Sequence, residues 1–299
     1  MMQTALHPPP HLRDALLEQV RVVGLGLRRP AQAAAVLAGL ATLLVAIIDL
    51  GQGDVIDFHP EDWMLPGMVG LLLPIAVWTG EDRFGPGFLW TLPVDRRRHA
   101  LARVVAGWAW LMGTVALFVL WLLVVSLVSG ERILAEEALR VVPNWPFPGA
   151  LDPATLRVVR RAPEPLFWLV PFTAATGTYL LASAVAVGVR HPLRWIVGTA
   201  LVVGFLAAVV DIADASRLIR PLLDAVDSFL VGPYGLDTLL TARTETLKVD
   251  ATLTTGETVI VWRGLPSVGQ WAAATLLWTC AGLALVWAAA SRHRERRRA

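Results

Sequence analysis

Six long apolar runs constrain the fold of this chain more than any other feature of its sequence. The runs have no Asp, Glu, Lys, Arg or His near their middles, and they lie at about 30–49, 63–80, 101–129, 165–189, 193–211 and 267–290. A helix of about 20 apolar residues is long enough to cross the hydrocarbon core of a bilayer. We therefore expect six transmembrane helices. The alternative is that some runs are buried helices of a large soluble protein, which would require six uncharged runs in one soluble chain.

The composition agrees with a membrane protein. Charged residues make up 17% of the chain, hydrophobic residues 56%, and the mean hydropathy is +0.58, whereas a soluble domain carries about 25% charged residues. The arginines lie between the apolar runs and do not gather on one face, so we do not expect nucleic-acid binding. The sequence predicts an all-α integral membrane protein whose six-span transmembrane domain covers residues 30–290.

The distribution of arginine predicts the orientation of the spans. Arginines are concentrated in 1–29, 81–103, 190–194 and the basic tail 291–299, whereas the loop after the first run, 50–62, has no Lys or Arg. Basic residues beside short loops stay on the cytoplasmic side of a membrane. We therefore expect both termini to be cytoplasmic.

Residues 1–29 are predicted to include an amphipathic connecting helix before the first span. Its apolar residues recur at spacings of four and three, at Leu12, Leu16, Val20, Val23 and Leu27. A helix with one apolar and one charged face can lie along the cytoplasmic membrane surface. The alternative is a solvated helix that packs against a partner subunit.

Two long outer loops are predicted at 131–164 and 212–266. The first begins with the helix-like sequence ILAEEALRVV and then becomes irregular. The second begins with RLIRPLLDAVDSFLVG, which favours a surface or partly re-entrant helix, and continues with LKVDATLTTGETVIVW at 247–262. Alternation of apolar and polar residues around TTGE predicts a β-hairpin. Together the loops could form a small extracytoplasmic cap.

Small residues form one stripe along the fifth run. Ala200, Gly204 and Ala208 are four residues apart, a spacing that lets membrane helices pack closely. We expect this stripe to pack inside the bundle, and a dimer interface is the alternative.

The sequence predicts no catalytic, cofactor-binding or metal-binding residue on this chain. Ion-coupled transport and intramembrane catalysis use ionisable or nucleophilic groups at membrane depth, and the runs offer only scattered Ser and Thr. The phosphate-binding pattern GxxxxGK[ST] does not occur, and the one lysine, Lys248, lies in an outer loop. The outer acidic cluster Asp54, Asp57, His59, Glu61 and Asp62 has ligand-type side chains without a defined metal spacing. We interpret it as a solvated loop.

The loop between the second and third runs has an unusual pattern for a connector. It begins with two acidic residues, continues through a Gly-Pro-Gly turn into an apolar cluster, and ends in three arginines. Exposed apolar side chains on a charged loop require a partner surface, although aromatic residues can also dip into the membrane interface. The residues expected to contact a partner are Glu81, Asp82, Phe84, Phe88, Leu89, Trp90, Leu92, Pro93 and Arg96.

The run from Glu81 to Arg98 resembles the first cytoplasmic loop of bacterial permease subunits of ABC-2 type ABC transporters. It shares the order of acid, glycine, apolar cluster, Leu-Pro-Val, one residue and Arg. The order of the whole chain is also similar: an amphipathic connecting helix, six spans, both ends inside, and an outer segment before the last span. In that family the loop forms a coupling helix that docks into a separately encoded ATPase.

The resemblance implies a transport function without enzymatic activity on this chain. ATP and Mg²⁺ would bind to the partner ATPase, and the working unit would contain two ATPase copies and a second permease, identical or different. The location would be the bacterial inner membrane, and apolar walls between the permeases would suit an amphipathic or lipid-like cargo. A different hypothesis is a membrane-embedded sensor or scaffold whose outer cap binds a ligand. A third, a lipid-modifying membrane enzyme, would need a polar cluster at the membrane interface.

Overall fold

The computed structural model describes most of the helical part of the chain and a small sheet. The described residues are 12–52, 64–79, 96–128, 136–142, 151–162, 164–189, 232–242 and 248–292, with single positions between 192 and 230.

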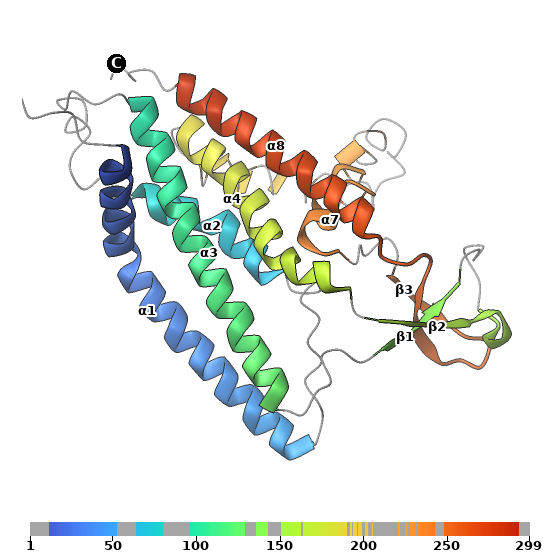
Figure 1. Ribbon diagram of the computed structural model, residues 1–299. Helices are drawn as coiled ribbons and strands as arrows, with labels where there is room; N and C mark the ends of the chain where they lie inside the picture. The colour runs from blue at the N-terminus through green and yellow to red at the C-terminus, as the bar shows by residue number, and fades with distance from the viewer. Residues whose placement is uncertain are drawn as a thin grey trace, which may run out of the picture.

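The helices form an elongated bundle (Figure 1). They are α1 (Leu12–Gln52), α2 (Leu65–Thr79), α3 (Arg96–Val128), α4 (Val170–Gly188), the short α7 (Leu236–Leu240) and α8 (Val268–Arg292). A 3-10 helix, η5 (Pro165–Leu169), leads into α4. Helix α4 packs against α2, α3 and α8, and α1 packs along α3.

Among the described residues, three helices are long and apolar enough to cross a membrane. They are Arg97–Leu127, Pro165–Gly188 and Val268–Ser291, and Leu65–Trp78 is apolar but shorter. In these three, 28%, 67% and 22% of the most apolar window is buried within the chain. Helix α4 is therefore central, whereas α3 and α8 expose large apolar side chains such as Leu117 and Leu276.

The predicted six-helix bundle is therefore shown only in part. The first run, 30–49, lies within α1, which is not among the three helices of spanning character. The fifth run, 193–211, is described only at single helical positions. The six spans stay a prediction, and a mainly helical chain with three helices suited to a bilayer is what the structure describes.

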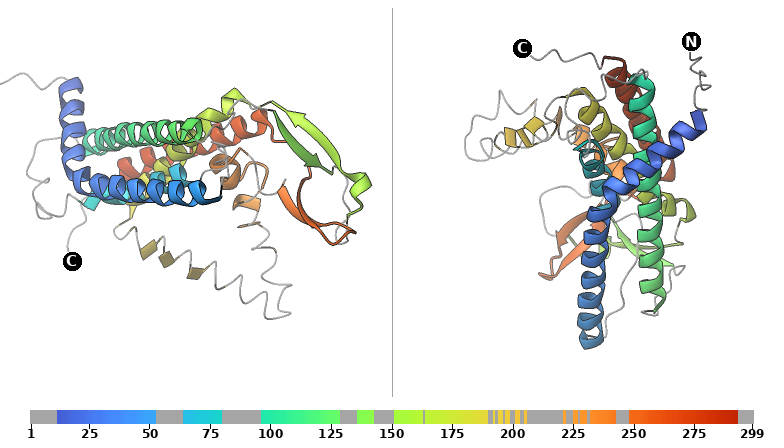
Figure 2. Two further views of the ribbon diagram at one scale, coloured as in Figure 1. Left: turned by 90° about the horizontal axis from the view of Figure 1, so that it is seen from below. Right: turned by 90° about the vertical axis from the view of Figure 1, so that its left-hand side faces the viewer.

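Helix α1 is bent into two segments (Figure 2). The first segment lies across the bundle and the second runs along it. Pro30 lies in the sequence of this helix, and an interior proline removes one backbone hydrogen bond and bends the helix. In the first segment Val23 and Leu27 are buried against Val77 of α2 and Ala106 of α3. This part of the stripe predicted to face the membrane thus packs against the chain's own helices.

A four-stranded sheet lies at one end of the bundle (Figure 1). Its strands are β1 (Glu137–Val141), β2 (Arg157–Arg161), β3 (Lys248–Thr252) and β4 (Thr258–Trp262), in the order β2-β1-β4-β3. The neighbours β1/β2 and β3/β4 are antiparallel, and β1 pairs with β4 in parallel at Val141 and Trp262. The sheet therefore joins the two long loops that were predicted to be outer into one unit.

The predicted hairpin at 247–262 is confirmed, with its turn at 253–257. The NH of Leu253 donates to the carbonyl of Glu257 at 2.8 Å, and Gly256 has φ +86°. A residue with a side chain rarely adopts this conformation, so glycine suits the turn.

The chain is mainly helical, as predicted, but its sheet has two strands more than the predicted hairpin. The prediction of a helical start to the loop at 131–164 is wrong, because ILAEEALRVV contains strand β1. Leu139 and Val141 of β1 are buried with Trp262, whereas Ala138 and Arg140 are exposed. This alternation has a period of two, as a strand requires. Pairing with β2 and β4 outweighs the local helix preference of the Glu-Ala-Leu sequence.

The short helix α7 packs against α4 and α8, whereas most of 217–232, predicted as a surface or partly re-entrant helix, lies outside the described residues. Leu239 of α7 is fully buried against Gly177 of α4. A side chain on Gly177 would overlap Leu239. The indole NH of Trp278 in α8 donates to the carbonyl of Tyr234 at 2.9 Å, in the turn before α7. Backbone groups away from water need such partners.

Candidate docking site at the connection between α2 and α3

The predicted docking loop is bounded by two described helix ends. Helix α2 ends at Thr79 and α3 begins at Arg96. Arg96 is the first residue of α3, and the other predicted contact residues lie outside the described residues: Glu81, Asp82, Phe84, Phe88, Leu89, Trp90, Leu92 and Pro93. The packing stripe Ala200, Gly204 and Ala208 and the outer acidic cluster of 54–62 also lie outside them.

Arg103 fixes the end of α2 to the start of α3. Its side chain is 8% exposed. The guanidinium donates from Nε to the Val77 carbonyl at 3.2 Å and from Nη2 to the same oxygen, and it lies 5.3 Å from the centre of the Trp78 ring. Carbonyls in the last turn of a helix lack intrahelical donors, and a cation there also complements the helix dipole. Arg103 therefore holds the last turn of α2 just before the predicted docking loop.

Tyr179 ties the same part of α3 to α4. Its hydroxyl donates to the carbonyl of Val104 at 2.8 Å, and its side chain is fully buried. Gly107 leaves room for the phenol, because a side chain at this position would overlap the hydroxyl of Tyr179. One buried hydrogen bond thus fixes the position of α4 relative to α3.

Helices α2 and α4 are in close backbone contact. Thr178 donates to the carbonyl of Gly67 at 2.8 Å and is also within bonding distance of the Ala174 carbonyl at 2.9 Å. A side chain on Gly70 would overlap the Ala175 carbonyl oxygen and Thr178. Small residues at crossing points allow this approach, so α2 and α4 are expected to move together.

The first turn of α3 also contacts α1 and α8. Arg97 stacks 3.4 Å from the centre of the Trp287 ring near the end of α8, an attraction of cation and aromatic face. The amide nitrogen of Gln19 in α1 lies 3.5 Å from Nδ1 of His99. Figure 1 shows the start of α3 and the end of α8 together at the end of the bundle away from the sheet.

The contacts converge on 97–107. Within three turns of α3, side chains or backbone groups meet α8, α1, α2 and α4, in that order along the chain. A force applied at the start of α3 would therefore reach four other helices directly. The arrangement suits transmission of movement, and among the described residues no group of three His, Cys, Asp or Glu could hold a metal ion.

Sequence reasoning missed the residues that make this arrangement. Arg103 was counted among basic residues that set orientation, and Tyr179 and Thr178 were not singled out. A signal existed for Arg103, because it stands alone inside the apolar sequence ALARVVAG. A charged residue within an apolar run needs an internal partner. The partner is a backbone carbonyl, and the sequence does not indicate which carbonyl accepts the hydrogen bonds.

Comparison of the chain with protein-family models, with curated proteins and with solved structures finds no match in any of the three.

Proposed function

We propose that this chain is the transmembrane permease subunit of an ATP-driven exporter of the ABC-2 type. It would form the substrate pathway and couple to a separate ATPase through the first cytoplasmic loop, residues 81–98. The resemblance of that loop to coupling loops supports the proposal. So do the three helices of spanning length and the amphipathic segment at the start of α1.

One structural observation carries the proposal. The loop is flanked by α2 and α3, and 97–107 of α3 contact α1, α2, α4 and α8. Packed helices respond to a push as rigid bodies with few alternative arrangements. Closure of an ATPase pair against this loop would therefore shift the helices together, which is what alternating access requires.

The proposed assembly contains two permeases and two ATPase subunits in the bacterial inner membrane. The second permease is another copy of this chain or a related one, and ATP and Mg²⁺ bind to the ATPases. Both termini and the docking loop would be cytoplasmic. This orientation is supported by the arginines near the start of α3 and by the sheet at the opposite end of the bundle.

Co-purification tests the proposal. The chain is expressed with its native neighbours, extracted in mild detergent, and its partners are identified by mass spectrometry. The double variant Leu89→Asp/Trp90→Asp is expected to lose the ATPase while the chain still inserts. The matched control is Val158→Asp/Ile260→Asp, which places the same charges on exposed apolar residues of the sheet and should keep the ATPase.

Two results would contradict the proposal. If the wild-type chain brings down no ATPase, the exporter assignment fails. If the Leu89→Asp/Trp90→Asp variant keeps the ATPase, the partner docks elsewhere and residues 81–98 are not the coupling loop.

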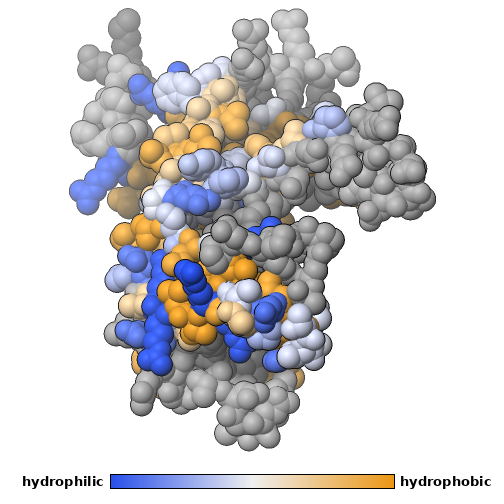
Figure 3. Space-filling model, turned by 90° about the vertical axis from the view of Figure 1, so that its right-hand side faces the viewer, coloured by the Kyte–Doolittle hydropathy of each residue, from blue (hydrophilic) through white to orange (hydrophobic). Residues whose placement is uncertain are grey.

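A second function, a membrane-embedded sensor or scaffold, is favoured by the sheet. Strands from two distant loops build one unit with its own core, which includes Val142, Leu151 and Val261. Its surface combines exposed apolar side chains, such as Val158, with arginines, and Figure 3 shows hydrophobic and hydrophilic residues side by side at this end. A sensor of this kind would bind a ligand or partner at the sheet and would co-purify without an ATPase.

A further inference from the structure

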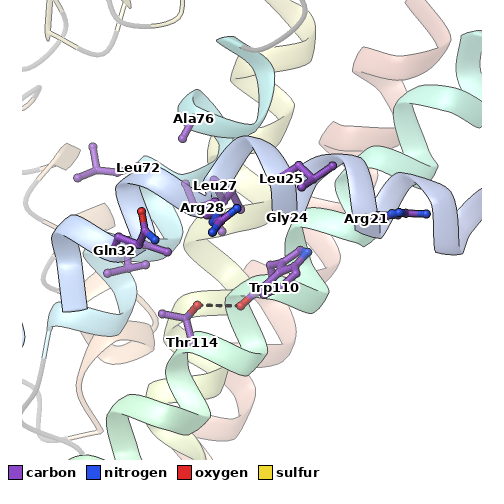
Figure 4. A pocket seen from close by; sticks show the side chains of 13 residues that line it. Arg21, Gly24, Leu25, Leu27, Arg28, Gln32, Leu72, Ala76, Trp110 and Thr114 are labelled. Carbon is purple, nitrogen blue, oxygen red and sulfur yellow. Dashed lines mark hydrogen bonds between the residues drawn. The ribbon is translucent and has the colours of Figure 1, made fainter. Parts of the chain in front are cut away.

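A pocket of about 920 Å³ lies between α1, α2 and α3. It is separate from the predicted docking loop. Its walls are residues 21–32 of α1, residues 69–76 of α2, and Trp110 and Thr114 of α3 (Figure 4). Ligand pockets in proteins measure about 300–1,000 Å³, so this one has room for a long apolar group.

The floor of the pocket is fixed by Trp110. Its indole NH donates to the carbonyl of Val20 in α1 at 2.8 Å. Gly24 is needed at this crossing, because a Cβ there would lie 2.5 Å from the Trp110 ring. Figure 4 shows the ring beside Gly24, and Thr114 donates to the Trp110 carbonyl at 2.9 Å. Specific contacts between α1 and α3 therefore shape this part of the pocket.

The rim combines apolar side chains with two arginines. Leu25 and Leu72 are 67% and 57% exposed, so the pocket opens onto the outer surface of the bundle. Arg21 and Arg28 are also exposed. They are seven residues apart on one helix face, or about 10 Å. No acidic residue lines the pocket, so the positive charge at its rim has no counterpart among the lining residues.

We propose that this pocket binds one anionic phospholipid of the membrane leaflet that contacts the first segment of α1. An acyl chain would occupy the apolar space along α2 and above Trp110, and the headgroup phosphate would lie between Arg21 and Arg28. Basic pockets between membrane helices recognise anionic headgroups, whereas the apolar part recognises lipid chains of any headgroup. Such a lipid would brace the bent α1 against α2 and α3. The inference does not depend on an ATPase partner.

Native mass spectrometry of the full chain in detergent tests this proposal. Phosphatidylglycerol and phosphatidylcholine with identical acyl chains are added in separate titrations. Wild-type chain should retain one phosphatidylglycerol more tightly than phosphatidylcholine. Removing both rim charges with Arg21→Gln/Arg28→Gln should weaken phosphatidylglycerol binding by about 30-fold, at the usual contribution of a basic residue near an anionic headgroup, and should abolish the preference.

Two further variants distinguish binding in the pocket from non-specific attraction between arginines and anionic lipids. Arg13→Gln/Arg29→Gln removes the same charge from exposed positions of α1 that do not line the pocket, and it should keep the preference. Ala31→Trp fills apolar space in the pocket and should weaken both lipids. Equal binding of the two lipids to the wild-type chain would overturn the proposal. Equal losses in the two arginine double variants would do the same. Because the arginines are exposed, these variants should fold, and co-purification of an ATPase is a separate readout.

Discussion

Replacing Arg103 with methionine should loosen the last turn of α2. Methionine keeps an unbranched apolar side chain of similar length but removes both donors to the Val77 carbonyl and the contact with Trp78. A hydrogen bond from a charged group contributes about 1.5–3 kcal/mol, and a contact of cation and aromatic ring contributes about 0.5–2 kcal/mol. Relief from burying a charge offsets part of this sum.

We expect a net loss of about 2 kcal/mol for local opening of the α2 terminus, which corresponds to about 30-fold faster amide exchange there. Hydrogen–deuterium exchange of the purified chain, followed in peptides that cover Leu73–Thr79, measures this loss. Val105→Met is the matched control, because Val105 is 46% exposed on the same helix. The reasoning is refuted if Arg103→Met leaves exchange in α2 unchanged, or if the control speeds it equally.

Two other substitutions test the packing of the bundle, each by the thermal unfolding midpoint in detergent. Gly70→Ala should cost about 1–3 kcal/mol, because its Cβ would overlap a carbonyl oxygen of α4. Gly113→Ala, at a helical position with nothing within 4 Å, should leave the midpoint unchanged or raise it, and a similar fall in both would contradict the proposed crossing. Trp278→Phe should cost about 1 kcal/mol, because it removes the donor to the carbonyl of Tyr234. The exposed Trp195→Phe is its control, and equal midpoints for these two variants would show that the bond contributes nothing.

Sequence reasoning located helices wherever an apolar run had the length of a bilayer. The runs at 101–129, 165–189 and 267–290 correspond to helices of spanning character, because the signal depends only on local composition. The hairpin at 247–262 was predictable for a similar reason: its alternation and its glycine turn are both local. These features need no knowledge of what the segment packs against.

The rest depended on partners far away in the chain. Strand β1 is recognisable only once β4 is placed beside it, and the contact joins Val141 to Trp262. In the candidate site, Arg103 and Tyr179 both donate to backbone carbonyls, and every residue of the sequence has a carbonyl. The sequence indicates that a buried arginine needs an acceptor, but it does not indicate which helix supplies it.

In the proposed transporter, the length of α2 would give the predicted docking loop a route to the opposite end of the bundle. Its 15 residues extend about 22 Å, which is less than the hydrocarbon core of about 30 Å. At the far end of α2, Gly67 meets Leu240 of α7, which occupies the space that a side chain on Gly67 would need. In the proposed transporter, a push on this predicted loop would move α2 through the Arg103 contact, and α2 would then press on α7. In the proposed transporter, this short helix would thus connect the predicted docking loop with α7 at the other end of α2.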